Sequence, residues 1–189
     1  MKPTLRNPTV SEPTVRWWPA VAGIALAGFV ALDTSGGSEL APILAASGLV
    51  YLGAAALGKP RSAWPLFFGT FVVIGAAKIG VAYVNATWVF LGLAALFVGY
   101  GLVHGAARPL DGLPLQTLAM VVVGTAAVIA MLVGGDVAAY LVAAGLLGHA
   151  AWDVYHHRAN KVVARSMAEF CCVLDTVLAI FIVVTAVRG

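Results

Sequence analysis

The sequence predicts an all-α, polytopic integral membrane protein: a bundle of seven transmembrane helices with the N-terminus in the cytosol and the C-terminus outside. Three observations support this prediction. The 189 residues are 61% hydrophobic and only 10% charged, whereas soluble domains carry about 25% charged residues. Seven apolar segments follow one another, and most approach the length of about 20 residues that crosses a bilayer. The loops between these segments alternate between basic and non-basic.

The first 16 residues are polar and contain three prolines and three basic residues. This composition predicts a disordered cytosolic tail over 1–16, followed by a single seven-helix transmembrane domain over 17–189. No cleavable signal peptide is expected, because the first apolar run starts only at Trp17 and further spans follow it directly.

The first three predicted spans are 17–32, 40–57 and 63–84. The first is the shortest, and it begins at two adjacent tryptophans, a residue type that favours the headgroup level of a bilayer. Each of the three has a proline within its first turn, where a missing N–H weakens a helix least. The third contains one charge, Lys78, whose side chain we expect to extend to the outer surface.

Four further spans are predicted at 86–105, 113–133, 137–157 and 166–187. Small residues recur four positions apart within them, as at Ala144 and Gly148. This spacing lets helix backbones approach one another closely in lipid, so it predicts a tightly packed bundle.

The distribution of basic residues predicts the orientation. Most of the 11 basic residues lie in the N-terminal tail and in the loops after the second, fourth and sixth spans. The exceptions are Lys78, inside the third span, and Arg188 at the C-terminus. Because basic loops stay in the cytosol, the N-terminus is predicted inside and the C-terminus outside. The expected location is the cell membrane, as a multi-pass protein.

The formal net charge of +3 does not indicate a nucleic-acid partner, because the basic residues are spread over short loops between apolar runs. The expected partners are instead membrane lipids and a hydrophobic small-molecule substrate. The sequence does not indicate an oligomeric state.

A polar stripe on the sixth span is the main functional signal. All four histidines lie at the predicted cytosolic ends of spans: His104 in the fourth, and His149, His156 and His157 in the sixth. On a helix, His149, Asp153 and His156 fall within about 60° of one another. Ionisable residues inside a membrane are expensive and are functional candidates by default, whereas His157 is expected to lie at the headgroups.

The seventh span supplies further polar groups at matching depths. Because it runs antiparallel to the sixth, equal depth pairs His149 with Asp175, Asp153 with Cys172, and His156 with Glu169. The adjacent Cys171 and Cys172 are expected to be reduced, since neighbouring cysteines rarely reach disulfide geometry.

These residues predict a site for a divalent metal, zinc or non-haem iron, near the cytosolic ends of 86–105, 137–157 and 166–187. The predicted metal ligands are His149, Asp153, His156 and Glu169. His104 and Asp175 are predicted as catalytic acid or base groups, or as further ligands. Three alternatives stay open: a purely structural polar network, Cys172 as a ligand, and a haem held by His104 and His149.

The leading functional hypothesis is a membrane-embedded, metal-dependent enzyme acting on a lipid-soluble substrate. One alternative is a proton-coupled transporter that uses the same Asp/His chain as a relay, although the apolar outer halves of the last four spans disfavour it. The other is a non-catalytic membrane scaffold or partner subunit, in which the polar stripe is satisfied internally.

Overall fold

The computed structural model describes residues 17–32, 34, 37–80 and 85–188. The all-α prediction is confirmed, since these residues form seven α-helices and two short 3-10 helices and no strand. The predicted tail over 1–16 lies outside the described residues. The helices are α1 (Trp18–Leu32), η1 (Gly37–Leu40), α2 (Ala41–Leu57), η2 (Pro60–Ser62), α3 (Ala63–Lys78), α4 (Ala86–Val103), α5 (Leu113–Val133), α6 (Gly135–Ala159) and α7 (Arg165–Arg188).

Four of these helices, α4 to α7, are long and apolar enough to cross a membrane. The others are shorter: α1 has 15 residues, α2 has 17 and α3 has 16. At a rise of about 1.5 Å per residue, α1 is about 22 Å long, against about 30 Å for the hydrocarbon core of a bilayer.

The predicted helix over 63–84 is too long. The structure ends α3 at Lys78, and Ile79 and Gly80 form a turn. Gly80 has a φ of 71°, which a glycine adopts without strain, and its N–H bonds to the carbonyl of Ala77. Residues 81–84, the remainder of the predicted helix, lie outside the described residues.

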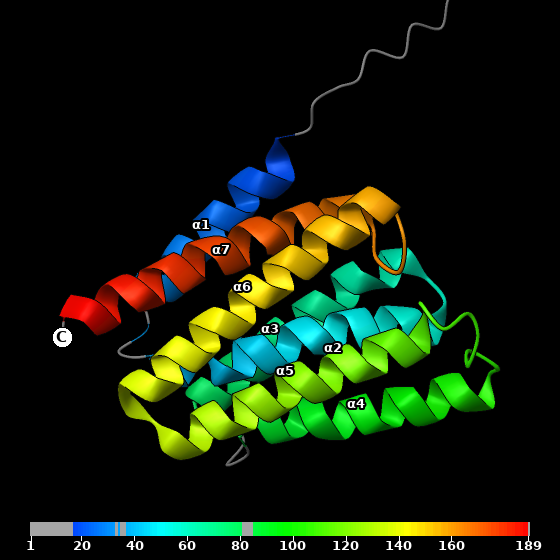
Figure 1. The fold of residues 1–189 in the computed structure, drawn as a ribbon, viewed down its shortest axis with the longest axis horizontal. Coiled ribbons are helices and arrows are strands. Elements are labelled where there is room, and N and C mark those ends of the chain that lie inside the picture. Colours follow the sequence, from blue (N-terminus) through cyan, green and yellow to red (C-terminus); the bar gives the residue numbers. More distant parts are fainter. Residues whose placement is uncertain (1–16, 33, 35–36, 81–84, 189) are drawn as a thin grey trace, which may run out of the picture.

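The helix α2 lies at the centre of the bundle, in contact with α3, α4, α5 and α6 (Figure 1). Its sequence, APILAASGLVYLGAAAL, is apolar or small on every side and is buried along most of its length. A helix that is apolar all round is stable only inside a larger assembly, and the small side chains let its neighbours approach closely.

The helices α6 and α7 form the most extensive contact of the bundle, and α1 lies against the outer side of α7 (Figure 1). The chain turns from α6 to α7 at Asn160, whose left-handed φ of 51° ends α6. Asparagine tolerates this conformation better than most residues. The tight reversal places α7 antiparallel to α6, as the sequence predicted, and brings their polar side chains to matching depths.

The basic loops meet at one end of the bundle. Lys161, in the loop after α6, forms an ion pair with Asp111, in the loop before α5. This hydrogen bond and the lysine charge hold the pKa of the Asp111 carboxyl below its ordinary value. In addition, the N–H of Ala164 donates to the carbonyl of Pro60, which joins the loop after α6 to the loop after α2.

Candidate metal centre

A cluster of ionisable side chains lies inside the bundle, where α2, α6 and α7 meet. His149 and Asp153 come from consecutive turns of α6, and Asp175 comes from α7. Their exposed fractions are 4%, 0% and 2%. Tyr51 of α2, which is 1% exposed, completes the group. The four side chains are therefore almost wholly buried among these helices.

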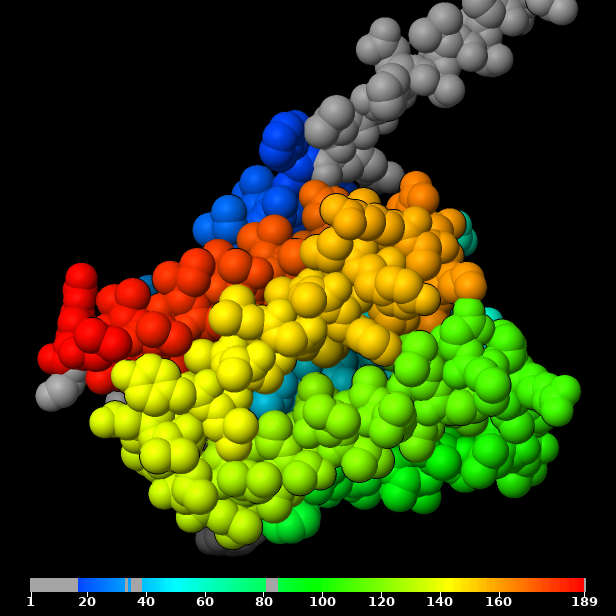
Figure 2. All heavy atoms as spheres, viewed as in Figure 1, coloured from blue at the N-terminus to red at the C-terminus, as the bar shows by residue number. Residues whose placement is uncertain are grey.

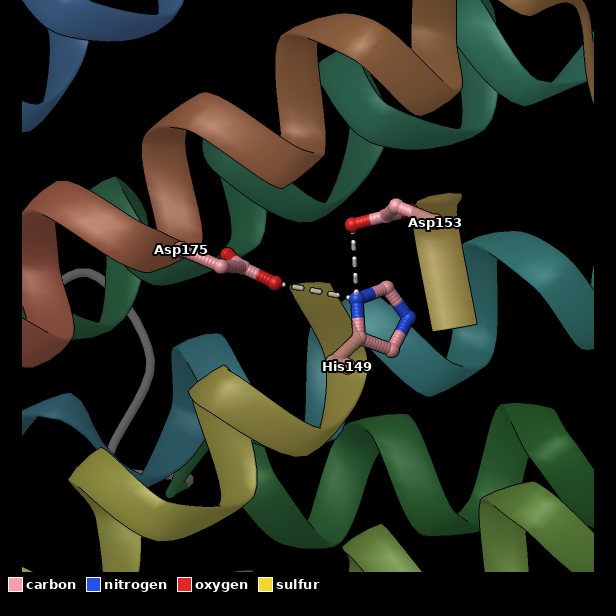
Figure 3. A group of neighbouring side chains, drawn as sticks. All are labelled: His149, Asp153 and Asp175. Carbon is pink, nitrogen blue, oxygen red and sulfur yellow. Dashed lines mark hydrogen bonds and ion pairs between the residues drawn. The ribbon is translucent and has the colours of Figure 1, made fainter. Parts of the chain in front are cut away.

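The imidazole of His149 lies between the two carboxylates (Figure 3). Its Nδ1 is 2.9 Å from Oδ2 of Asp175 and 3.4 Å from Oδ2 of Asp153. Since carboxylate oxygens accept hydrogen bonds, Nδ1 donates to Asp175 in this arrangement. Its other ring nitrogen, Nε2, is buried without a hydrogen-bond partner among the described residues, as is Oδ2 of Asp153.

The Tyr51 hydroxyl donates a hydrogen bond of 2.6 Å to Oδ1 of Asp153. The tyrosine ring lies edge-on to two imidazoles, with centroid distances of 5.2 Å to His149 and 5.0 Å to His156. This contact fixes the rotamer of Asp153 and directs its second oxygen, Oδ2, towards His149. Tyr51 thus orients a carboxylate that faces the imidazole.

The charge of the cluster depends on the state of its two carboxylates. With both ionised, a single imidazolium would leave one net negative charge in an apolar interior, where an uncompensated charge is strongly destabilising. A divalent cation held among Asp153, Asp175 and His149 would remove this excess. It would also contact Oδ2 of Asp153, which lies 3.4 Å from Nδ1 of His149 but has no hydrogen-bond partner among the described residues.

The spacing of the three donors fits a metal ion. One ligand atom from each of His149, Asp153 and Asp175 lies within 4.8 Å of the others. Tetrahedral zinc holds N and O ligands at about 2.1 Å, which separates any two ligands by about 3.4 Å. The observed separations from Nδ1 of 2.9 and 3.4 Å are close to this value. Three protein ligands would leave one position of a four-coordinate ion to a water molecule or a substrate, as in catalytic rather than structural zinc sites.

The structure places His156, a predicted ligand, in a different hydrogen-bond network. Its Nδ1 is 2.9 Å from the carbonyl oxygen of Trp152, so this nitrogen carries the proton. Its Nε2 then accepts from the side-chain amide of Gln116 at 3.1 Å. The Trp152 indole donates to the other side of the same amide at 3.2 Å, which fixes the amide orientation. Both nitrogens of His156 are therefore occupied within a neutral network.

The structure does not bring Glu169 or His104 into the cluster. Glu169 is half-buried near the start of α7, outside the group of closely spaced donors. His104 is exposed at the end of α4, where its ring stacks on Tyr100 with a centroid distance of 4.0 Å. The helix α4 packs against α2, α3 and α5, so α2 rather than α4 completes the site formed by α6 and α7.

The two cysteines are free, in agreement with the sequence-based expectation. Cys171 is buried with its sulfur 3.5 Å from that of Met167, whereas Cys172 is only half-buried. Lys78 is exposed at the end of α3.

Two cavities flank the cluster on different sides. One, of about 290 Å³, lies among α1, α2, α3 and α7 and reaches Asp175. The other, of about 410 Å³, lies among α2, α5 and α6 and reaches His149. The hydrogen bond between His149 and Asp175 therefore joins side chains that line different cavities.

Sequence reasoning missed Tyr51 and Gln116. Each is a polar residue in a mainly apolar span, a signal that marks a candidate but does not say which helix faces it. Comparison of the chain with protein-family models, curated proteins and solved structures found no match.

Proposed function

We propose that this chain is a seven-span membrane protein whose His149, Asp153 and Asp175 side chains bind a divalent metal, zinc or non-haem iron. We further propose that this centre belongs to an enzyme acting on a lipid-soluble substrate. The observation that carries the proposal is the buried group of three donors at metal-ligand spacing, two of them carboxyl groups.

The chemical role follows from the donor set. An ion with an open coordination position polarises a carbonyl group or activates a water molecule. The residues that would hold that ion are His149 and Asp153 from α6, and Asp175 from α7. The Tyr51 hydroxyl keeps Asp153 oriented through its hydrogen bond. The surrounding apolar side chains exclude bulk water, which strengthens every electrostatic interaction inside the site.

Elemental analysis of detergent-purified protein tests the metal proposal. We expect about one zinc or iron ion per chain in the wild type, and less than about a tenth of that in His149→Ala and Asp153→Ala, because each removes one of three ligands. Glu169→Gln and His104→Ala serve as matched controls and are expected to keep the metal, since both residues lie outside the cluster.

Two results would contradict this proposal. A metal-free wild type that stays monodisperse without added metal would contradict the claim that the cluster is a metal centre. Loss of metal in Glu169→Gln or His156→Gln, with retention in Asp175→Asn, would instead favour the ligand set that the sequence alone predicted.

A proton relay is the second candidate function, and one observation favours it. His149 and Asp175 are hydrogen-bonded to each other and line two different cavities, so a proton exchanged between them would pass from one cavity to the other. This candidate predicts that the purified protein is metal-free. Vesicles that contain it are expected to transport protons across their membrane, and vesicles with Asp175→Asn are not.

The proposed orientation places the N-terminus in the cytosol and the C-terminus outside. The meeting of the basic loops at one end of the bundle, through the Lys161–Asp111 and Ala164–Pro60 contacts, supports it. A fluorescent protein that matures only in the cytosol is expected to fluoresce when fused to the N-terminus and to stay dark at the C-terminus. Fusion after Lys161, before α7, is the control and is expected to fluoresce; the reverse pattern would contradict the orientation.

A further inference from the structure

The cavity of about 410 Å³ is an elongated groove between α5 and α6 with α2 as its floor. Figure 2 shows atoms of α2 between those of α5 and α6 at this position. Along α5 the lining residues run from Leu115 to Ala126 on one face of the helix. At about 1.5 Å per residue, this stretch is about 16 Å long.

The two ends of the groove differ in polarity. At one end lie Tyr51, Gln116, His149 and Trp152. Beyond them the lining is apolar as far as Ala126 and Ala144. The polar end lies towards the end of the bundle where the basic loops meet, because α5 begins there and α6 ends there. An amphiphile in the groove would therefore point its head towards the basic loops and its chain towards the bundle centre.

His149 supplies an unpaired polar atom at this polar end. Its Nδ1 faces Asp153 and Asp175, and neither of these residues lines the groove. The opposite edge of the imidazole ring, which carries Nε2, therefore faces the groove. Nε2 is buried and has no hydrogen-bond partner among the described residues. A ligand head with a hydroxyl or carbonyl group would satisfy it.

No residue that lines the groove carries a formal Lys, Arg, Asp or Glu charge. Phosphate and carboxylate heads are usually recognised by arginine or lysine, so this lining favours an uncharged head. The mouth of the groove is formed by small residues on α6, and Ala144 and Gly148 are exposed. A chain can therefore enter sideways from the bilayer.

We propose that this groove binds a single-chain lipid with a small uncharged polar head, such as a long-chain alcohol or its ester. The head lies against His149 and Gln116, and the chain extends along α5 towards Ala126. The inference rests on the proposed function, for which it names the substrate class and the route by which the substrate reaches the centre.

Photolabelling of the purified protein with a long-chain alcohol that carries a diazirine in its chain tests the groove. Labelled peptides are expected to come mainly from the groove-lining parts of α5 and α6. Excess unlabelled alcohol is expected to remove the label, whereas the corresponding alkyl phosphate is not.

Gly148 offers a variant that fills the groove. A Cβ at this position would meet no atom within 4 Å, so a large side chain can be added without a clash at its base. Gly148→Phe is expected to lower specific labelling about tenfold, because displacing two methylene groups alone weakens binding by about that factor. Gly92→Phe is the matched control: Gly92 is an exposed glycine within α4, with the same free space and outside the groove.

Metal content separates failure of this inference from failure of the metal proposal. Gly148→Phe is expected to keep the wild-type metal content while losing the label. Three results would overturn the inference: labelling spread over all lipid-facing helices, labelling that excess alcohol does not remove, and labelling that survives in Gly148→Phe. Equal competition by the alkyl phosphate would overturn the claim that the groove selects an uncharged head. A metal-free wild type that still labels specifically would overturn only the metal proposal. If Gly148→Phe does not yield monodisperse protein, Ala144→Phe fills the other end of the groove and decides the same question.

Discussion

Removal of the proposed metal ion by a chelator is expected to lower the melting temperature of the purified protein by about 10 °C. An ion that binds only the folded state at about 1,000 times its dissociation constant contributes about 4 kcal/mol. For a chain of this size, 1 kcal/mol corresponds to a shift of about 2–4 °C. The physical reason is that chelation leaves Asp153 and Asp175 facing one imidazole without a cation.

Thermal unfolding followed by tryptophan fluorescence, with and without a chelator, measures this shift. Asp175→Asn is the control, since it lacks one ligand and is expected to melt at the same temperature in both conditions. A wild type whose melting temperature changes neither with the chelator nor with added zinc or iron would contradict the prediction.

Gly23→Leu is expected to destabilise the bundle by about 3 kcal/mol, through the contact between α1 and α7. A Cβ at position 23 would lie 2.7 Å from the carbonyl oxygen of Phe170 and 3.3 Å from the backbone nitrogen of Leu174. Backbone atoms cannot rotate away as a side chain can, so α1 must move off α7. Overpacking of this kind costs about 1–3 kcal/mol, and leucine adds more volume than a single methyl group.

Gly28→Leu is the matched control on the same helix. Gly28 is exposed, and a Cβ there would meet no atom within 4 Å, so wild-type stability is expected. Denaturant titration in mixed micelles measures both variants, and equal stability of the two would contradict the proposed packing. Gly23→Leu is also expected to keep its metal content, because α1 contributes no side chain to the cluster.

The sequence alone was sufficient to predict most helix boundaries. Seven apolar runs correspond to seven α-helices, because turn residues interrupt the runs. The exception is α3, which ends at Lys78 because Gly80 turns the chain. The antiparallel order of the last two helices also predicted the pairing of His149 with Asp175, which the hydrogen bond of 2.9 Å confirms.

Only the tertiary structure decided which side chains share the site. Sequence reasoning matched His156 with Glu169 in depth, yet His156 bonds to Gln116 of α5, and Glu169 lies outside the cluster. Depth along an axis follows from counting residues, whereas the direction of a side chain depends on how the helix is rotated. The helices here are apolar on nearly every side, so few residues indicate that rotation.

The identity of the third helix at the site could not be predicted for the same reason. The sequence pointed to the fourth span through His104, whereas α2 lies at the centre and supplies Tyr51. Helices in a membrane bundle pack against one another where small residues let their backbones approach closely, and such residues occur on most of these helices. Composition and charge thus predicted a helical membrane bundle with polar groups in its interior, and packing determined which donors meet there.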